Sequence, residues 1–238
     1  VPVFAVYSTF LQRAYDQLLH DVALTGAHVV FGVDRAGLVG ADGETHHGIF
    51  DVQYLSTVPG MTVLCPASFA ELREMLRRAL TDYTTPVAIR YPRGGEGAYT
   101  ACCGEEAVSE LRQGSDGTIL TYGVMINEAL ACAELLHQRG IEIRIIKLNR
   151  IAPLCAEALE QAIGDTNCLL VAEECAAAGC VGQRIAAILA ECGKTPGKLK
   201  LCNLGGIVPP QGGVAELYRT FALDAQSLAV TMEEMIHE

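Results

Sequence analysis

Residues 28–48 read HVVFGVDRAGLVGADGETHHG and join a buried-strand pattern to a polar, glycine-rich segment. The first six of these residues form a largely apolar run of the kind that makes a buried strand. The fifteen residues from Asp34 to Gly48 then carry four glycines, two histidines and four charged groups. A solvated surface loop is the simpler interpretation, but such a loop does not need a cation, an acid and an imidazole together. Because open parallel sheets bind ligands at the carboxyl ends of their strands, we expect a ligand site here.

The same alternation of strand and helix continues on both sides of this stretch. Strands are expected at residues 1–7, 28–34, 61–65 and 87–91, and then at 118–122, 141–148, 168–172 and 199–203. Helices are expected at 10–22, 50–57 and 68–82, and then at 125–139, 155–163, 181–192 and 224–236. This order predicts an α/β protein of two doubly wound, mainly parallel sheets covered on both faces. The glycine-rich segment 95–117 is predicted to be a linker between domains at 1–94 and 118–238.

Composition narrows the function classes. Of the 238 residues 50% are hydrophobic, and the formal net charge is −11, which argues against nucleic acid and acidic membranes as partners. No apolar stretch approaches the length of a membrane span, and the first residues lack a signal-peptide layout, so a cytoplasmic protein is expected. The ten cysteines contain no Cys-x-x-Cys pair, which favours reduced thiols over disulfides or a metal site.

Candidate binding residues follow the predicted strand ends. Arg35 and Arg93 each come after a strand, and a guanidinium group suits phosphate geometry; surface ion pairs are the alternative. Asp42 and His46 lie four residues apart in the loop, where an imidazole can exchange a proton near neutral pH. The neighbouring His47 is taken as solvent-exposed.

Aromatic residues flank the end of the first strand. Tyr7 and Phe10 could cover a flat heterocycle, although a role as core aromatics is equally consistent with the pattern. Arg13 lies one helical turn beyond Phe10 and could place a cation at the same rim, or face solvent.

Three motifs together resemble one family. They are YSTFLQR at residues 7–13, the loop at 34–48, and RYPRG at 90–94. In this order they resemble the 1-deoxy-D-xylulose-5-phosphate synthase family, thiamine-diphosphate enzymes related to transketolase. The resemblance implies a pyrimidine-binding domain lacking its first segment, followed by a transketolase C-terminal domain.

The resemblance also implies roles for the candidate residues. Arg35 and Arg93 would bind the phosphate of glyceraldehyde 3-phosphate, with Arg13 and Tyr7 as further substrate-binding residues. Asp42 and His46 would be catalytic, next to the thiazolium ring. Phe10 would stack on the aminopyrimidine of the cofactor, with Tyr7 beside it.

The activity implied for the intact enzyme is condensation of pyruvate with glyceraldehyde 3-phosphate, with loss of CO2, through a thiamine-diphosphate enamine. The product would feed isoprenoid, thiamine and pyridoxal synthesis. The family's ylide-forming glutamate and its Gly-Asp-Gly…Asn motif for Mg²⁺ and diphosphate are absent from this sequence; Gly-Ala-Asp-Gly at 40–43 lacks the asparagine. We therefore expect no metal site here, a missing N-terminal domain as partner, and an isolated chain without activity.

The sequence is also consistent with two alternatives. The chain could belong to a transketolase or to the β-type subunit of a 2-oxoacid dehydrogenase, although the sequence of residues 34–48 resembles the synthase more. It could also be a non-catalytic assembly subunit that pairs with a separate N-terminal chain. The second half is expected to form a homodimer without supplying catalytic groups, and Glu173-Glu174 could be an acid–base pair or a plain β-α turn.

Overall fold

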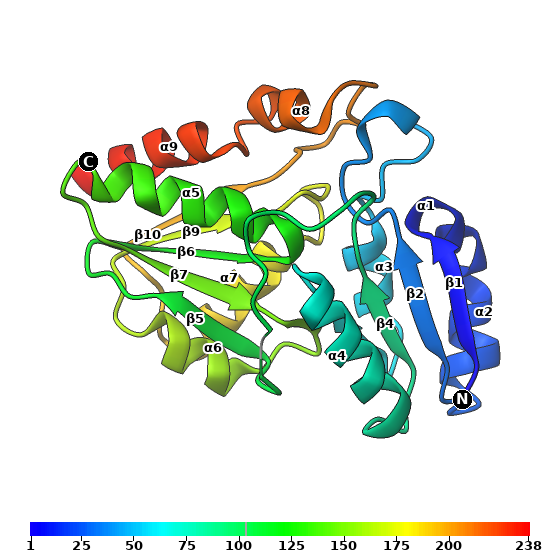
Figure 1. Cartoon of the computed structure of the whole chain (residues 1–238). Helices are drawn as coiled ribbons and strands as arrows, with labels where there is room; N and C mark the ends of the chain where they lie inside the picture. Colours follow the sequence, from blue (N-terminus) through cyan, green and yellow to red (C-terminus); the bar gives the residue numbers. More distant parts are fainter. Residues whose placement is uncertain (103) are drawn as a thin grey trace.

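The computed structural model describes residues 1–102 and 104–238, and it contains two five-stranded sheets side by side (Figure 1). In the first sheet the strand order is β1-β2-β4-β3-β8. The first four strands are parallel, whereas β8 runs antiparallel to β3. Their bounds are β1 Val3–Tyr7, β2 Val30–Asp34, β3 Thr62–Leu64, β4 Val87–Arg90 and β8 Arg150–Ala152.

The second sheet has the order β10-β9-β6-β7-β5. Four of its strands are parallel, and β5 pairs antiparallel with β7 at the edge. The bounds are β5 Val108–Arg112, β6 Gly117–Tyr122, β7 Ile143–Leu148, β9 Cys168–Ala172 and β10 Lys198–Cys202. The predicted architecture of two mainly parallel α/β units is confirmed.

Helices cover both faces of each sheet. The first half contains α1 Ser8–Leu11, η1 Gln12–Ala14, α2 Tyr15–Gln17, η2 Leu18–Ala23, η3 Gly40–Asp42, α3 Asp51–Ser56 and α4 Phe69–Thr81. The second half contains η4 Gly123–Met125, α5 Ile126–His137, α6 Ala156–Ile163, α7 Val181–Glu191, α8 Val214–Thr220 and α9 Ala225–His237. The helix expected at 10–22 is thus a series of short helical turns, with Leu11 and Leu18 buried.

One hydrophobic core joins the two halves. Leu11 and Val52 from the first half lie in the same buried cluster as Leu120, Ile146 and other residues of the second sheet. A second core lies beneath α5 and α9 and also includes Leu38 of the first half, and a third lies beneath α4. Because apolar burial at about 25 cal/mol per Å² is the main stabilising contribution, the two domains stabilise each other.

Two strands depart from the expected division of the chain. The segment 95–117, predicted as a linker, contains β5, and β8 from the second half completes the first sheet. Both strands are short and lie at sheet edges, so they have only a weak apolar pattern.

Nine cysteines are free thiols, and Cys103 lies outside the described residues. Within the described part of the chain, no helix is long and apolar enough to cross a membrane.

Candidate functional site

The loop after β2 begins with a constrained turn. Arg35 has φ 58°, the left-handed region that is costly for a residue with a side chain. The carboxylate of Asp34 supports this turn: Oδ1 accepts a hydrogen bond from the Arg35 amide at 2.7 Å, and Oδ2 pairs with Arg35 Nη1 at 3.1 Å. At the base of the loop, Gly37 and Gly48 exchange two backbone hydrogen bonds of 2.8 Å. The turn therefore aims the Arg35 guanidinium in a fixed direction.

Asp42 joins the two predicted phosphate-binding arginines. One oxygen, Oδ2, lies 3.1 Å from Arg35 Nε and 3.4 Å from Arg93 Nε. Arg93 follows β4, the neighbour of β2 in the sheet, so both arginines come from carboxyl strand ends at one edge. The side chain of Arg35 is 20% exposed and that of Arg93 is 44% exposed, so both can meet a ligand from solvent.

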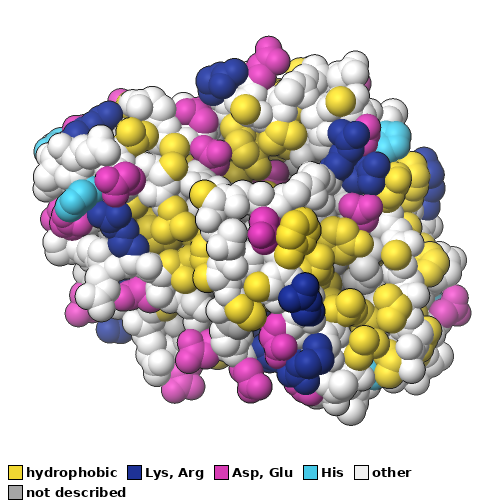
Figure 2. Space-filling model, viewed as in Figure 1, with side chains coloured by type: hydrophobic (Ala, Val, Ile, Leu, Met, Phe, Trp, Pro, Cys, Tyr) yellow, Lys and Arg dark blue, Asp and Glu magenta, His cyan; other side chains and the backbone are white. Residues whose placement is uncertain are grey.

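The aromatic residues complete the same cluster. The rings of Tyr7 and Phe10 are stacked with centroids 5.3 Å apart, and the Arg35 guanidinium carbon lies 3.9 Å from the Tyr7 centroid. The His46 ring centroid is 5.4 Å from that of Phe10, and the Arg13 guanidinium carbon also lies 5.4 Å from the Phe10 centroid. All seven residues selected from the sequence thus lie together, from three segments of the chain. Figure 2 shows dark blue cationic side chains beside a cyan histidine at the upper right of this face, near the position of the loop in Figure 1.

The expectation that His47 is solvent-exposed is wrong. Its side chain lies inside the loop, with the residue only 1% exposed. Nδ1 accepts a hydrogen bond from the Val39 amide at 3.1 Å, so Nε2 carries the proton and donates it to the Pro210 carbonyl at 3.3 Å. Burial lowers the pKa of His47 despite these contacts, which favours the neutral ring. The error arose because two adjacent histidines in a polar loop give no signal of which one turns inward.

Glu173 and Glu174 do not form a carboxylate pair. Glu173 accepts hydrogen bonds from the Val181 and Gly182 amides at the start of α7, at 3.0 and 2.8 Å. Glu174 instead reaches the first half of the chain, where its Oε2 accepts from the Leu38 amide at 3.1 Å. Sequence reasoning missed this contact with the loop, since a doubled glutamate at a strand end carries no information about direction.

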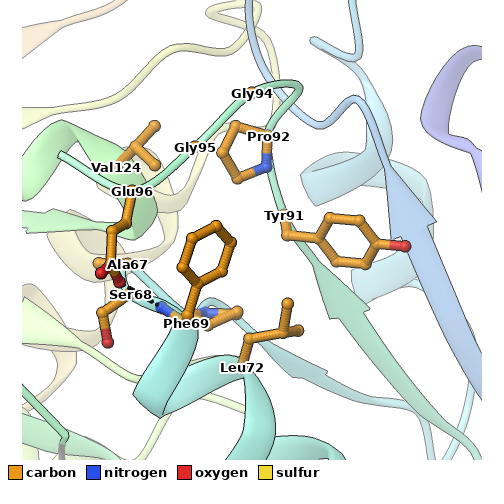
Figure 3. A pocket seen from close by; sticks show the side chains of 11 residues that line it. Ala67, Ser68, Phe69, Leu72, Tyr91, Pro92, Gly94, Gly95, Glu96 and Val124 are labelled. Carbon is orange, nitrogen blue, oxygen red and sulfur yellow. Dashed lines mark hydrogen bonds between the residues drawn. The ribbon is translucent and has the colours of Figure 1, made fainter. Parts of the chain in front are cut away.

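Two cavities border the site. A cavity of about 220 Å³ between the halves is lined by residues that include Leu38, Arg93, Glu128, Glu174 and Tyr218. Figure 3 shows a smaller one of about 50 Å³, where the Phe69 ring points toward Pro92 and Glu96 accepts a hydrogen bond from the Phe69 amide at 2.7 Å. The smaller cavity has room for only one or two water molecules. The larger one extends the site from Arg93 toward the second half.

The described side chains offer an aromatic surface and cations, but no cluster of metal ligands. Among the described residues, no three His, Cys, Asp or Glu side chains lie close enough together to hold a metal ion. An exposed aromatic ring is present, because Phe10 is 38% exposed next to His46. The site can therefore stack against a ring and bind an anion through its own side chains.

Comparison with protein families gives two matches that cover nearly the whole chain. Residues 1–95 match the pyrimidine-binding domain of transketolase, and residues 106–228 match the transketolase C-terminal domain.

Curated relatives are named 1-deoxy-D-xylulose-5-phosphate synthase. The protein from Chlorobaculum tepidum is 44% identical over 237 residues, and this alignment covers 96% of the chain and 36% of the relative. One from Geobacter sulfurreducens is 39% identical, with 99% and 38% covered. The chain thus spans little more than a third of the length of these relatives.

Solved structures share the fold. A split-gene transketolase, described as an inactive beta4 tetramer, superposes with a TM-score of 0.86 at 24% identity, covering 100% of this chain and 77% of that one. A transketolase variant from Pichia stipitis gives 0.79 at 16% identity, covering 99% of this chain and 34% of that one.

Proposed function

This chain belongs to the transketolase family, and on that premise we propose that it forms part of a 1-deoxy-D-xylulose-5-phosphate synthase. The proposed reaction of the whole enzyme joins pyruvate to glyceraldehyde 3-phosphate with loss of CO2. Sequence identity of 39–44% with synthases, over nearly all of the chain, supports this assignment. We further propose that the enzyme acts as a homodimer in the cytoplasm.

The observation that carries the proposal is the meeting of Arg35 and Arg93 at one oxygen of Asp42. Each guanidinium has five N–H donors, and these ion pairs use only part of them. Two such groups at one sheet edge can bind a phosphate through charge-assisted hydrogen bonds. The phosphate of glyceraldehyde 3-phosphate is the group we assign to them, with Arg13 at the rim.

The aldehyde end of the substrate would then lie toward His46 and Tyr7. The His46 ring is half-buried, and its Nδ1 lies 2.9 Å from the Thr45 hydroxyl. Its other nitrogen, Nε2, can hold a proton for the aldehyde oxygen, which becomes a hydroxyl in the product. Asp42 lies close enough to orient the substrate hydroxyls while it holds the two arginines.

Thiamine diphosphate fits one part of this site. Phe10 offers an exposed ring on which the aminopyrimidine would stack, next to Tyr7. When bound, the cofactor supplies the carbon that takes up pyruvate and lets CO2 leave. Since the described residues contain no metal-binding group, we propose that Mg²⁺ and the diphosphate are held by other parts of the enzyme.

The test of the proposal is Arg93→Ala in the active enzyme. Loss of a charge-assisted pair costs about 1.5–3 kcal/mol, so the KM for glyceraldehyde 3-phosphate should rise roughly 10- to 150-fold. The KM for pyruvate should change little, and Arg35→Ala should behave alike.

Arg77→Ala is the matched control, because the ion pairs of Arg77 with Glu74 and Asp82, on α4 and at its end, are exposed. It should leave both constants unchanged. An equal rise of both KM values in the Arg93 variant would refute the phosphate assignment.

A second candidate is a separately encoded subunit that needs a partner chain. The observation in its favour is that this chain covers 77% of the split-gene transketolase chain, against little more than a third of the synthases. Mixing this chain with the N-terminal part of a synthase tests it: product formed only by the mixture supports a two-chain enzyme.

A further inference from the structure

The second half of the chain holds the loop at 34–48 in three places. Glu174 accepts a hydrogen bond from the Leu38 amide at 3.1 Å, and Gln211 Nε2 donates to the Ala41 carbonyl at 2.8 Å. The Pro210 carbonyl accepts from His47 Nε2 at 3.3 Å. Figure 1 shows this loop, in light blue, next to the orange segment that leads into α8.

We propose that Glu174 is a positioning residue: from the second domain, its carboxyl group fixes the loop that presents Arg35, Asp42 and His46 to the substrate. The assignment of the substrate phosphate rests on the proposed function. The contacts that hold the loop do not depend on it.

The geometry around Glu174 is tight. The residue is 4% exposed, and its Oε2 also accepts a hydrogen bond from Tyr218 Oη, on α8, at 3.0 Å. Gly37 has φ 79°, and a Cβ at this position would collide with the carboxyl group of Glu174. The backbone of the loop therefore lies directly against this side chain, two residues away from the turn at Arg35.

Glu173 provides a natural contrast. It is as deeply buried as Glu174, but its hydrogen bonds are with the start of α7, Tyr122 and Cys175, all in the second half of the chain. Removing either carboxylate should destabilise the protein, since each leaves buried donors without a partner. Only removal of Glu174 should loosen the loop relative to the rest of the structure.

Ionisation of Glu174 should make the opening of the loop depend on pH. Burial raises its pKa to about 7, opposed by Arg90 on β4, the Leu38 amide and Tyr218, and assisted by Asp51 on α3. An opened loop would expose the carboxyl to water, where its pKa returns toward 4.5. Raising the pH from about 4.5 to 7 therefore favours opening, because the ionised form is relatively more stable when it is solvated.

The experiment is amide hydrogen exchange of the folded chain, comparing Leu38 with the core amide of Leu120. In Glu174→Ala, Leu38 should exchange roughly 5- to 150-fold faster relative to Leu120, the range expected for one lost buried acceptor. Glu173→Ala should leave this ratio unchanged. The proposal is overturned if both variants shift the ratio equally, since Glu174 would then act only through global stability.

If Glu174→Ala does not fold, the conservative variant Glu174→Gln provides the hydrogen-exchange test. Glu174→Gln retains an acceptor without a titrating charge, so its Leu38 protection relative to Leu120 should not change between pH 5 and 8. In the native protein this relative protection should fall over the same range. Identical pH dependence in both proteins would refute the role of Glu174.

Kinetics of the active enzyme then separate this proposal from the proposed function. Glu174→Ala should raise the KM for glyceraldehyde 3-phosphate more than that for pyruvate, whereas Glu174→Gln should restore it. If Arg93→Ala leaves the KM for glyceraldehyde 3-phosphate unchanged, the phosphate assignment fails, and hydrogen exchange still decides whether Glu174 holds the loop.

Discussion

His46 and His47 are adjacent residues in opposite environments. His46 faces Phe10 at the solvent side of the cluster, whereas His47 is enclosed between Val39 and Pro210. We predict that His47→Ala lowers the free energy of unfolding by about 1–3 kcal/mol, because two buried groups lose a partner. His46→Ala should change stability little and slow turnover. Urea denaturation and steady-state kinetics of both variants measure the two effects.

The neutral state of His47 gives this prediction a pH signature. Its pKa is below the ordinary value, so its contribution to stability is present above about pH 6.5 and declines as the pH falls through the lowered pKa. His47→Ala should remove that part of the acid sensitivity. An unchanged pH profile, or a larger stability loss in His46→Ala, would show that the two rings have been assigned to the wrong environments.

At the level of single residues, the sequence predicted which side chains meet but not how they are held. Arg35, Asp42 and Arg93 follow two strand ends of one parallel sheet, and strand ends of such a sheet converge. Glu174 and Gln211 could not be found in this way, because their contacts with the loop depend on how two sheets pack. Packing between domains is set by the shape of the buried surfaces, which no local pattern records.

The conformation of the loop at 34–48 depends on the close approach of its two ends. At Gly48, an added Cβ would collide with the Arg35 carbonyl and would lie 2.7 Å from Cβ of Ser8, at the start of α1. Gly48→Ala should therefore displace the turn at Arg35, destabilise the protein by about 1–3 kcal/mol and weaken substrate phosphate binding.

Gly95→Ala is the control, since nothing lies within 4 Å of its added Cβ. Thermal unfolding and the KM for glyceraldehyde 3-phosphate of both variants provide the measurement. If the two variants had equal thermal stability and equal KM values, close approach of the loop ends at Gly48 would not be required.

The predicted elements were those with a full apolar face. Strand β9 is buried along its whole length and β2 along most of it, and both were expected within two residues of their bounds. Strands β5 and β8 and the helix α8 were missed; each is short, and each packs through only a few residues. Their conformation is dictated by the neighbouring sheet or loop rather than by their own periodicity.

Across the whole molecule, a buried ion pair connects the two halves. Lys147 on β7 lies 2.9 Å from Glu71 on α4, and both side chains are completely buried. We predict that Lys147→Met destabilises the protein by about 3–5 kcal/mol, because it leaves the Glu71 carboxylate buried without its cation.

Replacing both partners, as in Lys147→Met with Glu71→Gln, should recover part of this loss. Lys194→Met is the control: its exposed pair with Asp165 should contribute about 0–1 kcal/mol. Chemical denaturation measures all three variants. A loss below 1 kcal/mol in Lys147→Met would show that the pair adds little to the connection between the halves.

The chain by itself should fold and yet lack synthase activity. The site offers a ring surface and two arginines, but the described residues contain no metal-binding group for a diphosphate. Calorimetry with thiamine diphosphate and Mg²⁺, together with an assay with pyruvate and glyceraldehyde 3-phosphate, tests this expectation. Micromolar cofactor binding or measurable product would contradict it.

The short strand β8 has a consequence for the order of events during synthesis. Its residues, Arg150–Ala152, cover the edge of β3, which was translated almost ninety residues earlier. Until they leave the ribosome, β3 has an open edge that can pair with strands of other nascent chains. The first sheet therefore cannot finish folding before part of the second half has been synthesised. We expect a ribosome-bound intermediate that ends before residue 150 to recruit chaperones more strongly than one released after it.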